Sequence, residues 1–303
     1  MRRGAFEDIM SLSAEKLPSA LADYFVAWRA DEGRITTSVL LAEIIDLLPD
    51  VTPVLRAVAA AVGDLADQTH SLSYHNHHHF REVTCLASVL ALKTEGLDDN
   101  ARLKVIIAAM AHDLGHDGAG NSPGGVHTPY RLEDKAFGTI APLLEQMGVS
   151  ASSQEEIKLL IRCTDVSSAS GGRSPHQEVK DFLRHGTPIT NKDLKVIETA
   201  PSLQKMIAIL CDADLLPSAG LNMDFLTAQG EALAKERGLD QASLKDTLYF
   251  LKHIASGGFL SDAGCANFNH RYFALLDAVE AQALEAATPD KKTAPTRTPS
   301  FKK

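Results

Sequence analysis

The chain has 303 residues, 45% of them hydrophobic and 23% charged, which is ordinary for a globular protein. Its formal net charge of −9 argues against a nucleic acid polymer as the partner, because proteins that bind one carry a basic surface. The charge leaves room for a small phosphate ester, since bound metal ions supply positive charge locally. The sequence shows no signal peptide and no apolar run of the roughly 18 residues that a transmembrane helix needs, so no membrane insertion is expected.

The cysteines are far apart and form no CxxC pair; they are Cys85, Cys163, Cys211 and Cys265. Three of them fall within apolar helical patterns, where a cysteine usually packs as a small hydrophobic residue. The sequence therefore predicts no disulfide framework and a cytoplasmic location.

Nearly every segment has the helical period and no strand–turn–strand pattern stands out, so the sequence predicts an all-α fold. The expected helices cover residues 14–30, 37–68, 80–93, 99–111, 130–147, 154–165, 175–185, 192–216, 223–237, 243–255 and 269–286. Pro49 and Pro53 should break the second helix, and four glycines with Pro123 predict a tight turn at 118–126. Expected N-caps are Asp99 and, for the helix at 154–165, Ser152 or Ser153.

Residues 287–303 contain three prolines, several basic residues and almost no apolar side chains. This composition is typical of a disordered, solvated tail. Residues 1–286 are then predicted to form one helical domain, with the helices of 14–68 packed on the rest.

The stretch 111–121 stands out because His112 and Asp113 directly follow the apolar run 105–110, and His116 and three glycines come next. Buried charge is costly unless something compensates it, and a metal ion is the usual compensation. We therefore interpret this helix end as part of a metal site.

A second cluster of imidazoles lies upstream, where five histidines occur between His70 and His79. On a helix His75 and His79 would share one face, with Glu82 three residues further on. His77 and His78 are more simply read as the polar start of the helix.

A third candidate is Asp214, which continues the apolar row of Leu203, Ile207 and Leu210 at helical spacing. Asp212 falls in a less apolar row and is expected to face solvent or a neighbouring turn. The same test places Glu133 in phase with a row that includes Ile140, and Thr164 with Asp165 at the end of another apolar face.

His79, His112, Asp113 and Asp214 together make a nitrogen and oxygen ligand set without cysteine. Imidazole suits zinc, iron or manganese, and carboxylate with water suits manganese or magnesium. Two carboxylates suggest a second metal bridged by Asp113, at the roughly 3.5–4 Å separation of two-metal phosphoester hydrolases.

The paired His112-Asp113 resembles the metal site of the HD-domain phosphohydrolases. Two longer motifs, Tyr74-His75-Asn76-x-x-His79 and His112-Asp113-x-x-His116-x-Gly118-x-x-Asn121, resemble the signatures of class I 3′,5′-cyclic nucleotide phosphodiesterase catalytic domains. Leu132-Glu133, Thr164-Asp165 and Ala213-Asp214-Leu215 follow in the order of that family. The resemblance covers residues 74–214 by motif and implies a compact multi-helix bundle that hydrolyses a cyclic nucleotide to its 5′-monophosphate in signal transduction.

The resemblance also implies roles for single residues. His79, His112, Asp113 and Asp214 would hold the tighter metal, usually zinc, and Asp113 would bridge to a second ion, magnesium or manganese. His75 would act as the general acid toward the leaving O3′, and Tyr74 and Asn76 would help to place its ring or the phosphate. Supporting positions around the metals fall on His116, Glu133, Thr164, Asp165 and Glu82.

Two departures from the family pattern concern support and substrate. Glu82 stands where the family has aspartate, and no glutamine that reads the purine is found on a late helix. Asn269, with Phe268, Tyr272 or Phe273 as the stacking ring, is the expected substitute. Asparagine is one methylene shorter, so base specificity is left open, as are the native metals, the oligomeric state and the regulation.

Three alternatives remain beside a cyclic nucleotide phosphodiesterase. The chain could be an HD-domain phosphohydrolase of another nucleotide or phosphoester, or a protein that keeps the fold without catalysis. Dioxygen chemistry at a di-iron site would need further histidines, for which His127 is a loose candidate. A cyclic di-GMP hydrolase is disfavoured because no Gly-Tyr-Pro run follows the motif.

Overall fold

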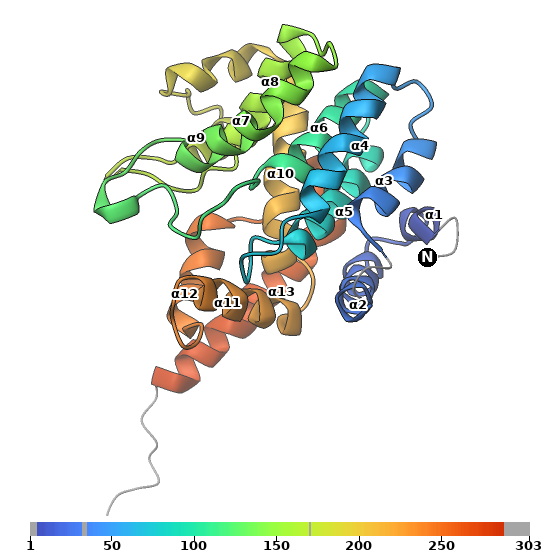
Figure 1. Ribbon diagram of the computed structural model, residues 1–303. Helices are drawn as coiled ribbons and strands as arrows, with labels where there is room; N and C mark the ends of the chain where they lie inside the picture. The colour runs from blue at the N-terminus through green and yellow to red at the C-terminus, as the bar shows by residue number, and fades with distance from the viewer. Residues whose placement is uncertain (1–4, 32–34, 170, 288–303) are drawn as a thin grey trace, which may run out of the picture.

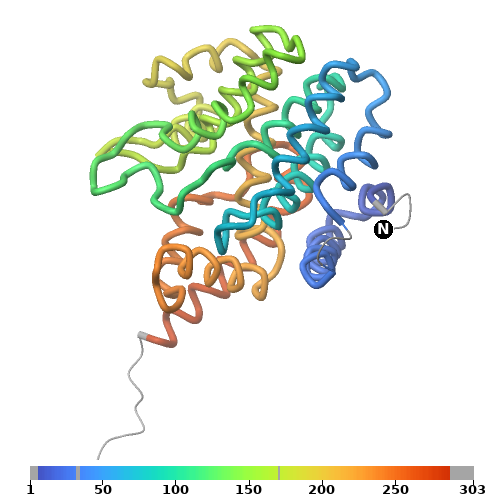
Figure 2. Tube along the Cα trace, in the orientation of Figure 1, coloured from blue at the N-terminus to red at the C-terminus, as the bar shows by residue number. Residues whose placement is uncertain are grey.

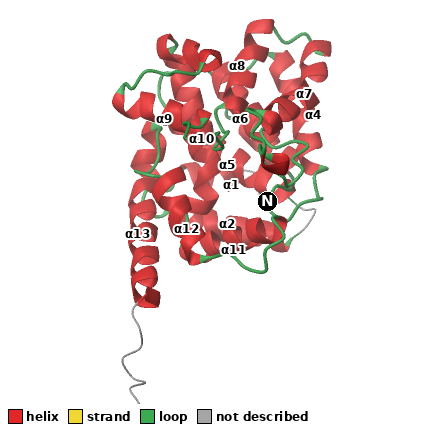
Figure 3. Cartoon of the chain, turned by 90° about the vertical axis from the view of Figure 1, so that its left-hand side faces the viewer, coloured by secondary structure: helices red, strands yellow, loops and turns green. Residues whose placement is uncertain are grey.

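The computed structural model describes residues 5–31, 35–169 and 171–287, and these residues contain helices, turns and loops but no strand (Figures 1 and 3). The all-α fold class predicted from the sequence is confirmed. The predicted disordered tail lies outside the described residues from 288 onward.

The helices follow one another with short connections. In chain order they are α1 (Ala5–Met10), α2 (Leu17–Ala30), α3 (Thr37–Asp46), α4 (Pro53–Asp67), α5 (His77–Lys93), α6 (Asp99–Ala111), η1 (Pro123–Gly125), α7 (Arg131–Gln146), α8 (Ala151–Arg162), α9 (Pro175–His185), η2 (Lys192–Thr199), α10 (Pro201–Ala219), α11 (Met223–Glu236), α12 (Leu244–Tyr249), η3 (Phe250–Ile254) and α13 (Asp262–Ala287).

Three helices, α5, α6 and α10, pack against one another at the centre of the molecule (Figure 1). They are buried on almost every side, as expected for helices whose apolar residues do not form a single stripe. Buried apolar residues from Phe6 in α1 to Val279 in α13 join in one hydrophobic cluster. The description of residues 1–286 as one domain stays a prediction, with this shared core in its favour.

Helices α3 and α4 pack on α5, and α4 also packs on α6, whereas two further groups of helices lie around the cavity. Helices α7 and α8 pack on each other and on α6, whereas α11 packs on α10, and α12 on α13. Figure 2 shows the connection between α6 and α7 swinging out on the left of the view, and α13 running downward away from the body. The cavity described below is lined by residues of both groups.

Helices α4 and α10 begin at prolines, Pro53 and Pro201. The break predicted near Pro49 and Pro53 is confirmed, because α4 begins at Pro53. The single helix predicted over 192–216 is wrong: a 3₁₀ helix, η2, ends at Thr199 and α10 begins at Pro201. The helix predicted over 243–255 changes at Phe250 from an α-helix to the π-helix η3. The last helix begins at Asp262, seven residues before the predicted start at 269.

The capping residues lie just upstream of the predicted ones. Asp98, one residue before the predicted Asp99, accepts a hydrogen bond from the Ala101 amide at the start of α6. Ser150 instead of Ser152 or Ser153 caps α8. The four cysteines are free thiols, and all but Cys265 are buried.

Among the described residues, no single helix is both long and apolar enough to cross a membrane. Helices α10 and α11 meet that criterion only as a pair, and they are bent by 98° relative to each other.

Candidate metal centre and its cavity

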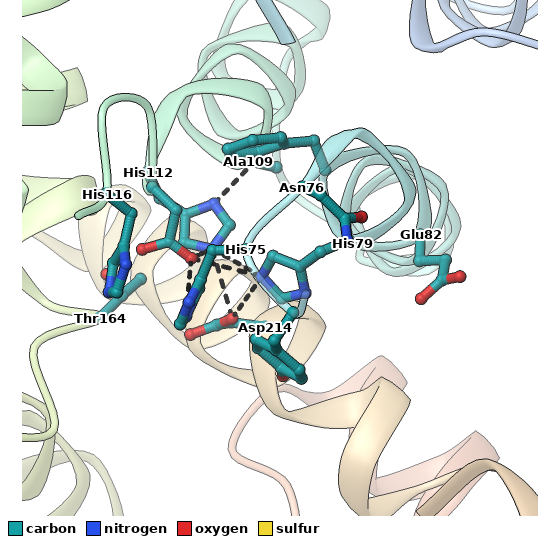
Figure 4. Close-up of polar contacts among 12 residues, drawn as sticks. His75, Asn76, His79, Glu82, Ala109, His112, His116, Thr164 and Asp214 are labelled. Atoms are coloured by element: carbon teal, nitrogen blue, oxygen red, sulfur yellow. Dashed lines mark hydrogen bonds and ion pairs between the residues drawn. The ribbon is translucent and has the colours of Figure 1, made fainter. Parts of the chain in front are cut away.

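Four side chains from the three central helices converge on one point (Figure 4). His79 lies in the first turn of α5, His112 is the C-cap of α6 with Asp113 next to it, and Asp214 lies within α10. Each contributes one ligand atom, and these atoms lie within 4.8 Å of one another. The structure thus brings together the four residues that the sequence suggested as metal ligands.

The separations of the two imidazole nitrogens from their neighbours suit ligands of one metal ion. The Nε2 atom of His112 lies 3.0 Å from Asp113 Oδ2 and 3.3 Å from Asp214 Oδ1. The Nε2 atoms of His79 and His112 are 3.3 Å apart. Ligand atoms at about 2.0–2.1 Å from a tetrahedral zinc ion are about 3.3–3.4 Å apart by geometry. Two imidazoles and two carboxylates at this spacing therefore fit a divalent cation.

The second ring nitrogen of His112 supports the same interpretation. Its Nδ1 atom lies 2.9 Å from the carbonyl oxygen of Ala109 in the last turn of α6, so Nδ1–H donates to that carbonyl and Nε2 is the atom that would bind a cation. The Nδ1 atom of His79 is buried and has no hydrogen-bond partner. His112 has the tautomer and orientation of a metal ligand.

The charges in the cluster are strongly coupled. Burial acts to raise the pKa of Asp113, but the imidazoles of His112 and His75 hold it well below its ordinary value. Burial likewise opposes ionisation of His112, yet Asp113 and Asp214 raise its pKa well above the ordinary value. Without a cation, protons on the imidazoles balance the two carboxylates, and a bound metal ion would take over that role.

A second group, formed by His75, His116 and Glu236, lies beside the first and also has the spacing of metal ligands. The Nδ1 atom of His75 lies 2.5 Å from Glu236 Oε1, and the His75 and His116 rings stack with their centroids 3.7 Å apart. On the other side of its ring, His75 Nε2 lies 3.7 Å from Asp113 Oδ2. His75 therefore joins Glu236 to the metal cluster.

Glu236 was not identified from the sequence, although it makes the closest contact to His75. Its other oxygen accepts hydrogen bonds from the backbone amides of Tyr74 and His75, at 2.9 and 3.0 Å. Burial acts to raise its pKa, but the His75 hydrogen bond lowers it to about 2. Glu236 continues the apolar row of Leu226 and Leu233 on α11, so the phase test that found Asp214 could have found it too.

Asn76 and Tyr74 shape the backbone and the packing around His75. The Asn76 side chain caps α5 by accepting from the His78 amide, and donates to the carbonyls of Leu72 and Ser73. The Tyr74 ring lies 4.7 Å from the His75 ring and 4.9 Å from the His79 ring, centroid to centroid. The turn before α5 thus holds His75 toward the cluster.

A cavity of about 440 Å³ opens in front of both groups. His116, Glu133, Thr164 and Asp165 line it together with Tyr74, His75, Asp113 and Asp214. Burial and the nearby His75 lower the pKa of His116 to about 4, so His116 is neutral at neutral pH. Burial and repulsion by Asp165 raise the pKa of Glu133 to about 8. A cation at this side of the cavity would relieve the repulsion among these carboxylates.

The carboxylates on this side are held by neighbouring loops. Asn121, the last residue of the longer motif, donates to Glu133 at 2.8 Å and accepts from the Leu132 amide. Asp165 accepts hydrogen bonds from the amide and hydroxyl of Ser167. Because both carboxylates line the cavity, these contacts orient groups that a second ion or its waters could reach.

Two residues considered for the site from the sequence, Glu82 and His127, lie elsewhere. Glu82 points away from the cluster (Figure 4) and binds Arg29 on α2 at 2.6 and 2.8 Å, with Gln229 on α11 at 3.2 Å. His127 lies near Ser122 and belongs to neither metal-capable group of the described residues. Asp212, which was expected to face solvent or a neighbouring turn, is buried and accepts hydrogen bonds from the turn at 260–261.

The predicted base-reading residues on the last helix do not line the cavity. Asn269 accepts a hydrogen bond from the Phe259 amide at 2.8 Å. Tyr272 is only 1% exposed and its hydroxyl donates to the carbonyl of Leu251. Phe273 is exposed beside it. The prediction of a substrate pocket at these three residues is therefore corrected, because Asn269 and Tyr272 contact the segment 251–259 and Phe273 is exposed outside the cavity.

No model of a known protein family matches the sequence, and no curated protein matches it. Solved structures do. The chain is similar to the phosphodiesterase domain of Salpingoeca rosetta rhodopsin phosphodiesterase, with a TM-score of 0.60, 17% identity, and coverage of 91% of this chain and 96% of that one. The chain is also similar to the phosphodiesterase domain of the RhoPDE fusion protein from the same choanoflagellate, with a TM-score of 0.54, 17% identity, and coverage of 91% of this chain and 93% of that one.

LmjPDEB1 in complex with IBMX is also similar, with a TM-score of 0.56, 14% identity, and coverage of 92% of this chain and 95% of that one. These likenesses extend over nearly the whole of each chain. They show that this chain has the fold of phosphodiesterase catalytic domains, as the motif resemblance implied.

Proposed function

We propose that this protein is a metal-dependent phosphodiesterase that hydrolyses a 3′,5′-cyclic nucleotide to the 5′-monophosphate. The observation that carries the proposal is one cavity lined by Asp113 and Asp214 of the His₂Asp₂ cluster and by His75 of the His75–Glu236 pair. The similarity to phosphodiesterase folds supports it. The substrate is then a small nucleotide phosphoester, and neither a nucleic acid polymer nor a membrane is involved.

The residues suggest two cation sites. His79, His112, Asp113 and Asp214 would hold the tighter ion, zinc or else iron or manganese. Asp113 would bridge to a magnesium or manganese ion, and the cavity-lining His116, Glu133, Thr164 and Asp165 would order its water shell. Two such cations would supply a hydroxide near neutral pH and would neutralise the negative charge that develops on the phosphoryl oxygens.

The chain's own contribution to the reaction centres on His75. Glu236 accepts from Nδ1 and stabilises the imidazolium, which leaves Nε2–H facing the cluster to donate. As water attacks phosphorus and the bond to O3′ breaks, the proton on Nε2 passes to O3′. The product keeps its phosphate on O5′, and the excess proton of the attacking water restores the acid.

The direct test is a substrate panel with the metal content measured on the same preparation. We expect hydrolysis of cyclic AMP or cyclic GMP, and we expect His75→Asn to retain its metals but lose turnover. Wild-type activity in that variant would disprove the acid role. Fewer than about one ion per chain in protein purified without chelator would favour a non-catalytic protein instead.

A second candidate function keeps the same chemistry on another nucleotide or phosphoester. It is favoured by the position of Asn269, Tyr272 and Phe273, none of which lines the cavity. Adding nucleoside monophosphates, nucleoside triphosphates and a chromogenic diester to the panel separates the two candidates. Hydrolysis of these compounds without hydrolysis of a cyclic nucleotide would establish the second.

A further inference from the structure

The cavity also includes a short apolar and aromatic surface, which lies on other helices than those that carry the metal-ligand cluster. Tyr249, Phe250 and Ile254, here called the distal wall, line the cavity at the end of α12 and in the π-helix η3. The Ala255 amide bonds the Phe250 carbonyl at 3.0 Å, which closes the wider turn of the π-helix. π-Helices are rare, and those that do occur are frequently found at functional sites.

A buried tyrosine on α13 holds this π-helix. The Tyr272 hydroxyl donates to the carbonyl of Leu251 at 2.9 Å and accepts from the amide of Gly257 at 3.2 Å. Leu251 is fully buried and Tyr272 is 1% exposed. One hydroxyl therefore provides hydrogen-bond partners for two backbone groups, the carbonyl of Leu251 and the amide of Gly257. Tyr272 itself does not line the cavity.

Two basic side chains on α9 hold the following turn. The buried Lys180 donates to the carbonyl of Ile254 at 2.7 Å and to the Ser256 hydroxyl at 2.8 Å. Arg184 donates to the carbonyls of Ser256 and Gly258, each at 2.5 Å. Burying an ammonium group is costly, and here burial lowers the Lys180 pKa to about 8. Burying this ammonium group costs more desolvation free energy than burying an apolar side chain would. Its hydrogen bonds fix the backbone at the end of the distal wall.

Helix α13 and helix α10 complete the attachment. Asn269 accepts from the Phe259 amide, and Asp212 accepts from the amides of Leu260 and Ser261 at 2.7 Å. Residues 250–261 are therefore connected by side-chain hydrogen bonds to α9, α10 and α13. A wall fixed in this way is preformed, so a ligand does not have to order it on binding.

We propose that Tyr272 and Lys180 are positioning residues for substrate recognition, acting through η3 on the distal wall. The wall presents two aromatic rings and one branched apolar side chain, and Leu226 and Leu233 on α11 line the same cavity. Such a surface stacks on the planar base of a nucleotide whose phosphate lies at the metal cluster. This inference rests on the proposed function and assigns base binding to α12 and η3 instead of α13.

The test compares Tyr272→Phe and Lys180→Met with wild type, on a cyclic nucleotide and on base-free methyl riboside 3′,5′-cyclic phosphate. We expect KM for the nucleotide to rise about fivefold or more in each variant, because each leaves a buried carbonyl unpaired and loosens the wall. Both kcat for the nucleotide and kcat/KM for the base-free substrate should stay within about twofold of wild type, because the metal cluster is untouched.

The matched control is Tyr130→Phe, which also removes a buried hydroxyl contact, here with Asn191, from a tyrosine that does not line the cavity. It should leave both KM values unchanged. An unchanged nucleotide KM in both Tyr272→Phe and Lys180→Met overturns the inference. So does an equal loss on both substrates, which would indicate general destabilisation. Failure of the wild-type protein to hydrolyse any substrate would instead refute the proposed function.

Discussion

The metal-ligand cluster and the distal wall both contribute side chains to one cavity but are built in opposite ways. The cluster lies on α5, α6 and α10, which pack on one another at the centre of the fold, and its polar side chains themselves form the site. The wall lies on the peripheral α12 and η3, and its surface is apolar and aromatic. Polar side chains that do not line the cavity hold its backbone: Tyr272 binds Leu251, Lys180 binds Ile254, and Asp212 holds the turn that follows at 260–261.

This difference predicts how substitutions in the two regions should act. Loss of a cluster side chain removes chemistry, so it should lower kcat without disturbing the core. Loss of a wall side chain or of its support changes the shape of the recognition surface, so it should raise KM. The following predictions test this separation, beginning with the largest expected effect.

Asp214→Asn should remove the tighter ion and lower kcat/KM by at least about 10³-fold, since even indirect partners of metal ligands are worth about 10–100-fold. Metal analysis and steady-state kinetics on the same sample measure both effects. The matched control is Asp212→Asn, two residues away on α10, which should keep its metals because Asp212 binds the 260–261 turn. Full metal content in Asp214→Asn would remove Asp214 from the ligand set.

Glu236→Gln should lower kcat about 10–100-fold with metals retained, because the neutral amide no longer stabilises the His75 imidazolium. The carboxylate has a pKa of about 2, so Glu236 stays ionised over any working pH. In the wild-type protein, the fall of kcat toward acidic pH should accordingly not arise from protonation of Glu236. Kinetics identical to wild type in Glu236→Gln would show that His75 needs no such partner.

Phe250→Ala should raise KM for the nucleotide about tenfold through lost apolar contact, with kcat within about twofold of wild type. Metal content should equal that of wild type. Equilibrium binding of the 5′-monophosphate product gives the same comparison without turnover. A loss confined to kcat would contradict the separation of the cluster from the wall.

Glu133→Gln should change stability in a pH-dependent way in the metal-free protein. Glu133 ionises near 4.5 in the unfolded chain and near 8 in the folded one. Between these values the folded chain retains a proton that the unfolded chain has lost, so its free energy of unfolding falls as pH rises. The glutamine variant should gain about 1 kcal/mol or more over wild type at pH 8. That gain should disappear near pH 4.

Urea denaturation of both proteins with chelator present, at the two pH values, measures this difference. Adding magnesium at pH 8 should stabilise wild type more than the variant, because the cation compensates the carboxylates. A difference between the two proteins that is the same at both pH values would argue against the repulsion between Glu133 and Asp165.

The parts of the site that the sequence could predict are those in which a polar residue interrupts an apolar row. His112, Asp113 and Asp214 were found in this way, and the structure brings them together with His79. Glu82 was proposed for its spacing three residues after His79 and for its place in the motif, yet it faces α2 and α11 and binds Arg29 and Gln229. Helical phase shows that a side chain is buried but not which neighbour it meets, since that depends on how the helices pack.

The sequence by itself determined the all-α class, the break at Pro53 and the candidate metal ligands, because periodicity, proline chemistry and buried charge are local properties. Only the tertiary structure decided that Glu236 pairs with His75, and that Asn269 and Tyr272 support the distal wall instead of lining the cavity. It also decided that Phe250 begins a π-helix. Each of these depends on contacts between segments distant in the chain, whose register follows from packing and not from local pattern.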